Sequence, residues 1–411
     1  MTGIVRKLEQ AARAARQDSE FAAAVRELPC AILLQVLGLE RSDTIVLWGE
    51  VRAAGPQDVC LQASPDIWER LAERVPAPGY HSFTAARRHA QGVRVLGADL
   101  RVAQALHALE RYFELLRGQV EAAPAHLDRS AISGRYANVR VGGQTASLYF
   151  EQSGRDDGPV LLLLHTAGAD SRQYHALMTD AELGATWRML AFDMPGHGRS
   201  PPLPGQAWIA GGLTSDAYRE TCLAFVRQVL RQPAVLLGCS MGAAMALHVA
   251  ARHPADVAGV VALEAPYRAA GRRTAMLCHP EVNQASHNPA YVRGLMGPTA
   301  ALSARREAAW IYSQAGFNVY ANDLRFYSED FDAEQHLEGL DARTFGISLL
   351  TGAYDYSASP DDTRRVAALI PGARFCEMPE LGHFPMLEDP KRLLAYLRPE
   401  LAHILSVRES A

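Results

Sequence analysis

The segment AVLLGCSMGAAMALHVAARH, residues 234–253, decides the fold of the larger part of this chain. AVLL predicts a short buried strand, and MGAAMALHVAARH carries the alanine, leucine and methionine residues that favour a helix. Between them, GCSMG places Ser240 at the centre of a G-x-S-x-G pattern. A strand that passes directly into a helix must bend tightly there, and the flanking glycines leave room where a side chain would clash. The pattern predicts a serine hydroxyl lifted clear of the backbone, with the N-terminus of the helix aimed at the same point.

A serine at such a bend needs partners. Its hydroxyl is a weak nucleophile at neutral pH, so a base must take its proton and an acid must orient that base. In folds where the nucleophilic serine stands on a strand-to-helix bend of this kind, the chain order is serine, acid, histidine. His383 lies in LGHFP, after the predicted strand ARFCEMPE and before the last predicted helix, and we assign it as the base. Asp355 ends the predicted strand GISLLTGAYD and is assigned as the acid, whereas Asp361 and Asp362 are better placed to cap the next helix.

Two backbone amides are needed to stabilise the oxyanion that forms when a serine attacks a carbonyl. Met241, which immediately follows the predicted nucleophile, supplies one of them. The second is expected from the loop HTAG after the apolar segment PVLLLLH. We assign Ala167 to this role, with Thr166 as the alternative.

The order of elements after about residue 135 predicts the fold class. Strands and helices alternate, which is typical of an α/β protein with a doubly wound, mostly parallel sheet. PVLLLLH has the continuous apolar character of a strand buried on both faces, and VRVGGQTASLYFEQSG predicts a hairpin around two glycines. The alternation pauses between about residues 266 and 340, and this segment is rich in aromatic residues. We interpret it as a helical lid over the site.

Four side chains are candidate substrate contacts. Thr166 lies beside the predicted oxyanion, Phe384 beside the predicted base, and Tyr267 and Trp310 in the predicted lid. The aromatic residues of the lid favour a moderately apolar or aromatic acyl or alcohol group in the substrate. An ordinary core for the lid itself is the alternative reading of the same residues.

The first part of the chain has a different pattern. With 411 residues, the chain exceeds the ~250–300 at which one hydrophobic core stops growing, so two domains are expected. Apolar residues at helical spacing predict helix up to about Leu37, interrupted near Pro29, and TIVLWGEV and DVCLQAS then predict strands. Residues 1–117 are therefore expected to form a small α+β domain, residues 118–134 a linker, and residues 135–411 the second domain.

Composition excludes several classes of function. The net charge is −4 and no block of Lys or Arg stands out, which argues against nucleic acid or an anionic membrane as partner. The six cysteines are scattered without a CxxC pair, so neither a zinc site nor a disulfide framework is expected, and a cytoplasmic location fits. The N-terminus lacks the apolar stretch of a secretory signal, and the longest apolar run is too short to span a bilayer. No Walker or Rossmann motif is present, so no cofactor or metal is expected.

The segments HTAG, DMPGHGRS, GCSMG, TGAYDYS and GHFPMLEDP together resemble the α/β-hydrolase superfamily over about residues 135–405. The resemblance implies that DMPGHGRS is a structural signature and that its His197 is architectural. The sequence departs from the usual pattern at two points. Thr166 follows His165 where glycine is usual, and Ala243 follows Gly242 where many relatives carry a second glycine.

The N-terminal part, about Phe21–Leu116, resembles the sterol-carrier-protein-2-like fold in its order of strands, a Trp-containing helix, the strand GVRVLGAD and a closing helix. That resemblance implies a sheet packed by helices around an apolar tunnel that holds lipid or serves dimer contacts. A homodimer is therefore one expectation, and an ordinary structural domain is the other.

The motifs together predict a serine hydrolase of the carboxylesterase type. It would cleave an ester or related acyl bond of a moderately hydrophobic small molecule through an acyl-enzyme. Three alternative functions are also compatible with these sequence features. They are a carbon–carbon hydrolase of ring-cleavage diketones, an acyltransferase, and a lipid-binding protein whose hydrolase site is vestigial.

Overall fold

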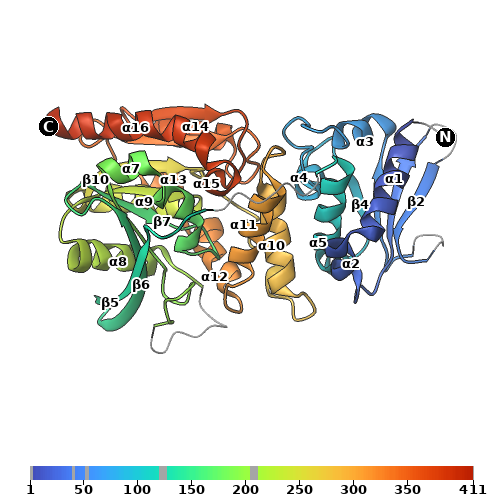
Figure 1. Ribbon diagram of the computed structural model, residues 1–411, viewed down its shortest axis with the longest axis horizontal. Helices are drawn as coiled ribbons and strands as arrows, with labels where there is room; N and C mark the ends of the chain where they lie inside the picture. The colour runs from blue at the N-terminus through green and yellow to red at the C-terminus, as the bar shows by residue number, and fades with distance from the viewer. Residues whose placement is uncertain (1–2, 39–41, 51–54, 120–126, 204–211, 411) are drawn as a thin grey trace. The chain divides into compact units, whose positions relative to one another are not determined.

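The computed structural model describes residues 3–38, 42–50, 55–119, 127–203 and 212–410 (Figure 1). Part of the predicted linker, residues 120–126, lies outside the described residues. The described part of the chain contains no helix that is both long enough and apolar enough to cross a bilayer.

The chain divides into two compact units, and the division runs through the predicted lid. Unit 1 consists of Met1–Ala123 together with Ala275–Ser313, and unit 2 consists of Pro124–Thr274 together with Gln314–Ala411. The sequence prediction assigned all of residues 266–340 to the second domain. Residues 275–313 instead belong to the same compact unit as the N-terminal residues, because their helices bury side chains against that part of the chain.

Unit 1 contains a four-stranded sheet in the order β2-β1-β3-β4. Its strands are β1 (Ile32–Leu37), β2 (Ser42–Trp48), β3 (Val59–Ala63) and β4 (Arg94–Leu96). β1 pairs parallel with β3 and antiparallel with β2. The prediction of helix up to Leu37 was wrong for this strand. β1 is central and covered on both faces, so its apolar residues follow one another without alternation, and periodicity does not separate such a strand from a buried helix.

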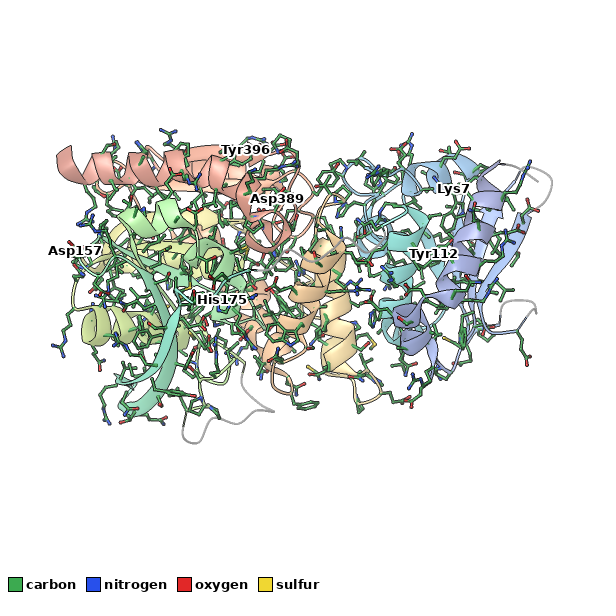
Figure 2. The ribbon with its side chains drawn as sticks, viewed as in Figure 1. Lys7, Tyr112, Asp157, His175, Asp389 and Tyr396 are labelled. Carbon is green, nitrogen blue, oxygen red and sulfur yellow. The ribbon has the colours of Figure 1, made fainter. Side chains whose placement is uncertain are left out.

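The helices of unit 1 surround a core that includes residues from both of its chain segments. They are α1 (Gly3–Gln17), α2 (Ser19–Val25), α3 (Pro65–Leu71), α4 (Phe83–Arg88), α5 (Asp99–Leu116), α10 (Gln284–Leu295) and α11 (Leu302–Tyr312). Trp68 of α3 and Phe113 of α5 are fully buried, and Ala290 of α10 joins the same core. Tyr112 of α5 (Figure 2) donates a hydrogen bond of 3.3 Å to the carbonyl of Leu8 in α1. The resemblance to a sterol-carrier-protein-2-like fold stays a prediction.

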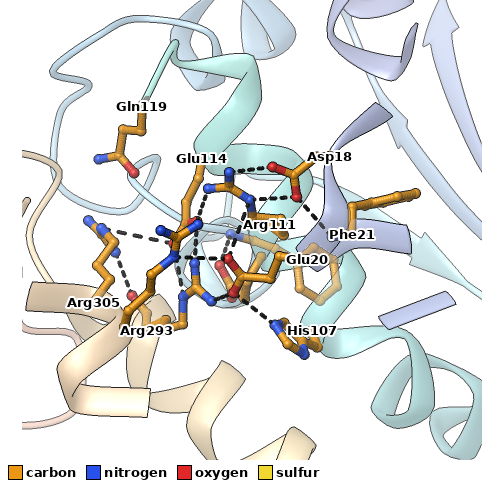
Figure 3. Close-up of polar contacts among 12 residues, drawn as sticks. Asp18, Glu20, Phe21, His107, Arg111, Glu114, Gln119, Arg293 and Arg305 are labelled. Atoms are coloured by element: carbon orange, nitrogen blue, oxygen red, sulfur yellow. Dashed lines mark hydrogen bonds and ion pairs between the residues drawn. The ribbon is translucent and has the colours of Figure 1, made fainter. Parts of the chain in front are cut away.

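Buried ion pairs join the two chain segments of unit 1 (Figure 3). Arg293 of α10 bonds to Glu114 of α5 at 2.5 Å, and both side chains are only 2% exposed. Arg293 also pairs with Glu20 of α2, and Arg111 bridges Glu114 at 2.9 Å and Asp18 at 2.6 Å. Charges removed from water in this way are costly unless each has partners, so the cluster fixes how α10 packs on α5 and α2.

Unit 2 is built on an eight-stranded sheet in the order β12-β11-β10-β9-β7-β8-β6-β5. The strands are β5 (Ser133–Val141), β6 (Gln144–Gly154), β7 (Val160–Leu164), β8 (Arg188–Phe192), β9 (Ala234–Cys239), β10 (Val257–Leu263), β11 (Ile347–Gly352) and β12 (Arg374–Met378). β7 to β12 pair in parallel, and the hairpin β5–β6 pairs antiparallel with β8 through β6. The predicted mostly parallel sheet is confirmed. Gly142 and Gly143 form its two-residue hairpin turn with φ of +52° and +81°, as a type I′ turn requires.

Helices cover both faces of this sheet, since every residue of β9, β10 and β11 is buried. The longer helices are α8 (Ser215–Ala224), α9 (Met241–Arg252), α14 (Pro360–Leu369) and α16 (Pro390–Ser410). Shorter ones are α6 (His175–Met178), α7 (Ala181–Thr186), α12 (Val319–Arg325), α13 (Ala333–His336) and α15 (Pro385–Glu388), with a π-helical segment η5 (Phe326–Asp330) directly after α12. The connections at the carboxyl ends of the parallel strands bring the site residues together.

Candidate active site

Ser240 stands on a strained bend between β9 and α9. Its φ of +55° and ψ of −115° lie in a region that residues other than glycine rarely adopt. The bend is possible because of its glycines. A Cβ on Gly238 would lie 2.2 Å from the backbone of Gly242, and a Cβ on Gly242 would lie 2.2 Å from the carbonyl oxygen of Leu164. The tight turn expected from the G-x-S-x-G pattern is therefore present, and no larger residue fits at either glycine.

The three residues predicted as nucleophile, base and acid lie together. The Nε2 atom of His383 is 2.9 Å from the Oγ of Ser240, and its Nδ1 atom is 2.6 Å from the Oδ2 of Asp355. All three residues are at most 4% exposed. The imidazole can therefore take the serine proton on one side while the carboxylate holds it in the right tautomer on the other.

Backbone amides hold the acid in place and favour its charge. The Oδ1 atom of Asp355 accepts hydrogen bonds from the amides of Ser357 at 2.6 Å and Ala358 at 3.1 Å. Burial by itself would raise the pKa of Asp355, but the charge of His383 and its hydrogen bond outweigh this effect and lower that pKa. Asp361 and Asp362 lie in the first turn of α14, and the cap of that helix is Ser359.

Glu388, which the sequence reasoning missed, fixes the loop that carries the base. Its Oε2 accepts a hydrogen bond from the amide of Gly382 at 2.7 Å, and its Oε1 accepts one from the amide of Phe384 at 2.9 Å. These two amides flank His383 on either side. Glu388 is 5% exposed and ends α15, so a short helix positions the imidazole through one carboxylate. The two adjacent acidic residues in GHFPMLEDP, Glu388 and Asp389, were the only sequence signal for this role.

Glu264, also missed, lies behind the acid. It directly follows β10, has a φ of +55°, and is fully buried. Both of its oxygens lie within hydrogen-bond distance of the amide of Gly352, at 3.0 and 3.1 Å. Burial, together with the charge of Asp355 and a hydrogen bond to it, raises the pKa of Glu264 well above its ordinary value. The raised pKa favours the neutral form of Glu264, which can donate a hydrogen bond to Asp355.

Ligand atoms of Glu264, Asp355 and His383 lie within 4.8 Å of one another, a spacing at which such groups can bind a metal ion. These are the atoms that hold the imidazole between Ser240 and its acid. A cation would have to displace those hydrogen bonds, so the arrangement is better suited to proton transfer than to metal binding.

The loop after β7 presents the second predicted oxyanion donor. Thr166 donates from its amide to the Oε1 of Gln173 at 3.0 Å, and Gly168 donates from its amide to the Oδ2 of Asp323 at 2.7 Å. Ala167 lies between Thr166 and Gly168, and no group in the described part of the chain accepts a hydrogen bond from its amide. The same holds for the amide of Met241 at the start of α9. These are the two amides assigned to the oxyanion from the sequence.

Helix α12 supports this loop. The ring of Tyr320 packs so closely on Gly168 that a Cβ there would lie 2.6 Å from a ring carbon. The Oδ2 of Asp323 also bonds to the Nε2 of His197 at 2.7 Å. Burial alone would lower the pKa of His197, but the charge of Asp323 outweighs it and raises that pKa. His197 thus connects the DMPGHGRS loop to α12, consistent with an architectural role.

Tyr327 is a further residue at the nucleophile. It lies in η5 and is 1% exposed. Its hydroxyl is 3.3 Å from the Oγ of Ser357, and the side chain of Ser240 lies close enough to influence the pKa of Tyr327. Burial raises the pKa of Tyr327, so the phenol keeps its proton and can donate it. An aromatic-rich segment was the only sequence signal, and π-helical turns of this kind occur frequently at functional sites.

Of the four candidate substrate contacts, the structure brings two to the triad and its oxyanion loop. The ring of Phe384 lies 4.8 Å from that of His383, and Thr166 sits in the oxyanion loop with its hydroxyl 3.2 Å from Gln173. Tyr267 instead bonds to Glu334, and the guanidinium of Arg365 stacks on its ring. Trp310 belongs to unit 1 and is 52% exposed.

Solved structures with the fold of unit 2 include several enzymes. A thermophilic esterase from Thermogutta terrifontis aligns over 66% of this chain and 99% of its own, with a TM-score of 0.54 and 20% sequence identity. An enol-lactonase from Burkholderia xenovorans aligns over 65% of this chain and 100% of its own, with a TM-score of 0.54 and 18% identity. At this identity the likeness shows the fold alone.

Curated relatives match shorter stretches. Pheophytinase from Arabidopsis thaliana is 30% identical over 145 residues, which are 29% of this chain and 30% of that protein. A pimeloyl-[acyl-carrier protein] methyl ester esterase from Neisseria meningitidis is 36% identical over 95 residues, which are 23% of this chain and 32% of that protein. The chain thus spans about a third of the length of these relatives.

A family model described as "Alpha/beta hydrolase family" matches residues 161–396, more than half of the 411-residue chain. The matched range contains the strained serine, the acid and the histidine described above. The chain therefore belongs to the alpha/beta hydrolase family.

Proposed function

We propose that this protein is a serine hydrolase that cleaves a carboxylic ester of a small, moderately hydrophobic molecule through an acyl-enzyme. The observation that carries the proposal is the position of the His383 ring, with one nitrogen 2.9 Å from the Oγ of Ser240 and the other 2.6 Å from Asp355. This is the geometry in which a histidine activates a serine hydroxyl.

The chemistry follows from the positions of the groups. The Oγ of Ser240 attacks the ester carbonyl while His383 takes its proton, and the carbonyl oxygen becomes an oxyanion facing the amides of Ala167 and Met241. His383 then gives the proton to the leaving alkoxide, which departs as the alcohol and leaves an acyl group on Ser240. A water molecule repeats the attack with the same base, releases the acid and restores the serine.

Several of the similar proteins act on esters or lactones, which supports ester cleavage as the proposed reaction. An esterase and an enol-lactonase share the fold, and a methyl ester esterase shares part of the sequence. Each of these acts on an ester or a lactone by its own printed name. Our proposal extends that bond type to this chain because its triad and oxyanion amides are complete.

A panel of aryl, alkyl and lactone esters tests the proposal. We expect the wild-type protein to cleave at least one ester class, Ser240→Ala to lose that activity, and the matched variant Ser406→Ala, at an exposed position in α16, to keep it. Mass spectrometry with a slowly deacylating ester should find the acyl group on Ser240. Equal turnover by Ser240→Ala, or no cleavage of any ester, would reject the proposal. Cleavage of a ring-cleavage diketone with all esters untouched would move the assignment to carbon–carbon hydrolysis.

A further inference from the structure

A buried arginine of unit 2, Arg272, contacts residues that lie close to the catalytic groups. Arg272 is only 5% exposed. Its Nη2 donates to the hydroxyl of Tyr320 at 3.5 Å, and its backbone amide donates to the Oγ of Ser328 at 3.1 Å. Ser328 in turn donates to the carbonyl of Ala269 at 2.7 Å, so the backbone between Ala269 and Arg272 is held by one serine.

The two tyrosines beside this arginine lie close to the catalytic groups. The ring of Tyr320 packs on Gly168 in the oxyanion loop, and the side chain of Tyr327 lies near enough to Ser240 for each to affect the other electrostatically. Burial is the main influence on the pKa of Tyr327 and raises it, while the charge of Arg272 acts on the same phenol and lowers its pKa. The positive charge of Arg272 therefore acts on Tyr327, which lies near the nucleophile Ser240.

A guanidinium in this position is a strong selector of substrate charge. It stays protonated at any physiological pH, and its planar array of donors matches the two oxygens of a carboxylate. Its field is screened less at a buried position, such as that of Arg272, than at the surface.

We propose that Arg272, together with the hydroxyl of Tyr320, binds a carboxylate of the substrate, so that the preferred esters carry a free carboxylate on their acyl or alcohol part. The inference rests on the proposed ester hydrolysis and narrows it to anionic esters. Tyr320 is already held against the oxyanion loop, so the carboxylate and the scissile carbonyl would bind to one rigid group of side chains.

Matched pairs of esters test the inference. Monomethyl adipate against methyl hexanoate places the carboxylate on the acyl part, and 3-carboxyphenyl acetate against phenyl acetate places it on the alcohol part. For the wild type we expect kcat/KM to be at least about tenfold higher for the anionic member of one pair, the size of a charge-assisted hydrogen bond. The pair that shows the preference identifies the part of the substrate that faces Arg272.

Variants then assign the preference to one side chain. Arg272→Gln should lower the anionic-to-neutral ratio of kcat/KM by about tenfold to a hundredfold, and Arg272→Lys should lower it less. Arg268→Gln is the matched control, because that arginine is half-exposed and pairs with Asp332. It should leave the ratio unchanged. An unchanged ratio in Arg272→Gln, or a wild type that does not prefer either anionic ester, would overturn the inference while leaving ester hydrolysis intact.

A measurement on the wild type alone covers the case in which the arginine variants fail to fold. Adipate should inhibit cleavage of phenyl acetate competitively and at least about tenfold more strongly than its uncharged diamide. Equal inhibition by the two compounds would also overturn the inference. Failure of the proposed function looks different, since no ester would then be cleaved in a Ser240-dependent way.

Discussion

Glu264 and Asp355, two buried carboxyl groups that follow adjacent strands of the sheet, each place an oxygen within 4.8 Å of the other and of the His383 imidazole. Two carboxylates so close to each other cannot both be charged at low cost. Ionisation is favoured at Asp355, because it faces His383 and accepts hydrogen bonds from two amides, whereas burial and the charge of Asp355 raise the pKa of Glu264 and favour its neutral form. The neutral acid thus adds a donor to the carboxylate that orients the base.

Glu264→Gln should preserve this arrangement. A glutamine amide can donate to Asp355 while its carbonyl accepts from Gly352, so we expect kcat/KM to stay close to that of the wild type. Glu264→Ala removes a hydrogen bond to a charged group, a loss of about 1.5–3 kcal/mol, and should lower kcat about tenfold or more. Steady-state kinetics with one ester compares the two variants. Equal losses in both would contradict a neutral donor at this position.

The same pair predicts a pH dependence of stability. The folded-state pKa of Glu264 lies above its unfolded value, so its contribution to stability is complete below the unfolded value and is lost as the pH rises toward the folded pKa. The glutamine side chain of the Glu264→Gln variant does not titrate. The free energy of unfolding of this variant relative to the wild type should therefore increase from pH 5 to pH 8, as measured by urea denaturation. A constant difference would show that the pKa of Glu264 is not raised.

Glu388 makes a separate prediction for the base. Glu388→Ala leaves the buried amides of Gly382 and Phe384 without their acceptor, which costs about 1–3 kcal/mol for each unsatisfied group. Because these amides flank His383, we expect kcat to fall while KM changes little. Glu388→Gln keeps one acceptor oxygen and should lie between the wild type and the alanine variant. A loss confined to KM would contradict a positioning role.

The three residues that the sequence assigns to the triad, and that the structure brings together, share one property. Ser240, Asp355 and His383 each follow a strand whose apolar pattern is easily recognised, and the family order fixes their roles. The sequence could not identify Glu264 or Tyr327, because their roles depend on burial and on contacts between segments far apart in the chain. Nothing in the sequence around Glu264 indicates that the pKa of its carboxyl group is raised in the folded protein.

The fold shows the same limit. Unit 2 could be predicted because alternating strands and helices specify a parallel sheet. The assignment of residues 275–313 to unit 1 could not be predicted, since it depends on Arg293 reaching Glu114, 179 positions earlier in the chain. The central strand Ile32–Leu37 was missed for a local reason, because an apolar run without alternation fits a buried strand and a buried helix equally well.

Glu151 should contribute to acid sensitivity. It is 4% exposed and bonds to His175 (Figure 2) at 2.8 Å and to Arg199 at 2.6 Å. Burial would raise the pKa of Glu151, but these partners lower it to about 2. A carboxylate with a lowered pKa stabilises the fold above its unfolded value of about 4.3 and loses that contribution as the pH falls toward 2. Glu151→Gln should therefore show a shallower loss of stability between pH 5 and pH 3, measured by thermal unfolding.

The ion pair between Arg293 and Glu114 should be essential for unit 1 although it is not essential for chemistry. Glu114→Gln leaves Arg111 and Arg293 buried without their shared carboxylate, which costs about 3–5 kcal/mol. Arg293→Met should cost a similar amount, and the double variant should cost less than the sum because both single changes break one network. Arg87→Gln, which breaks an exposed pair with Asp99, should cost less than about 1 kcal/mol.

Hydrogen–deuterium exchange of the amides in α5 and α10 measures the opening of this unit rather than of the whole chain. Additive losses in the double variant would mean that the two residues stabilise unit 1 independently, and the ion pair would then not be what holds α10 to α5.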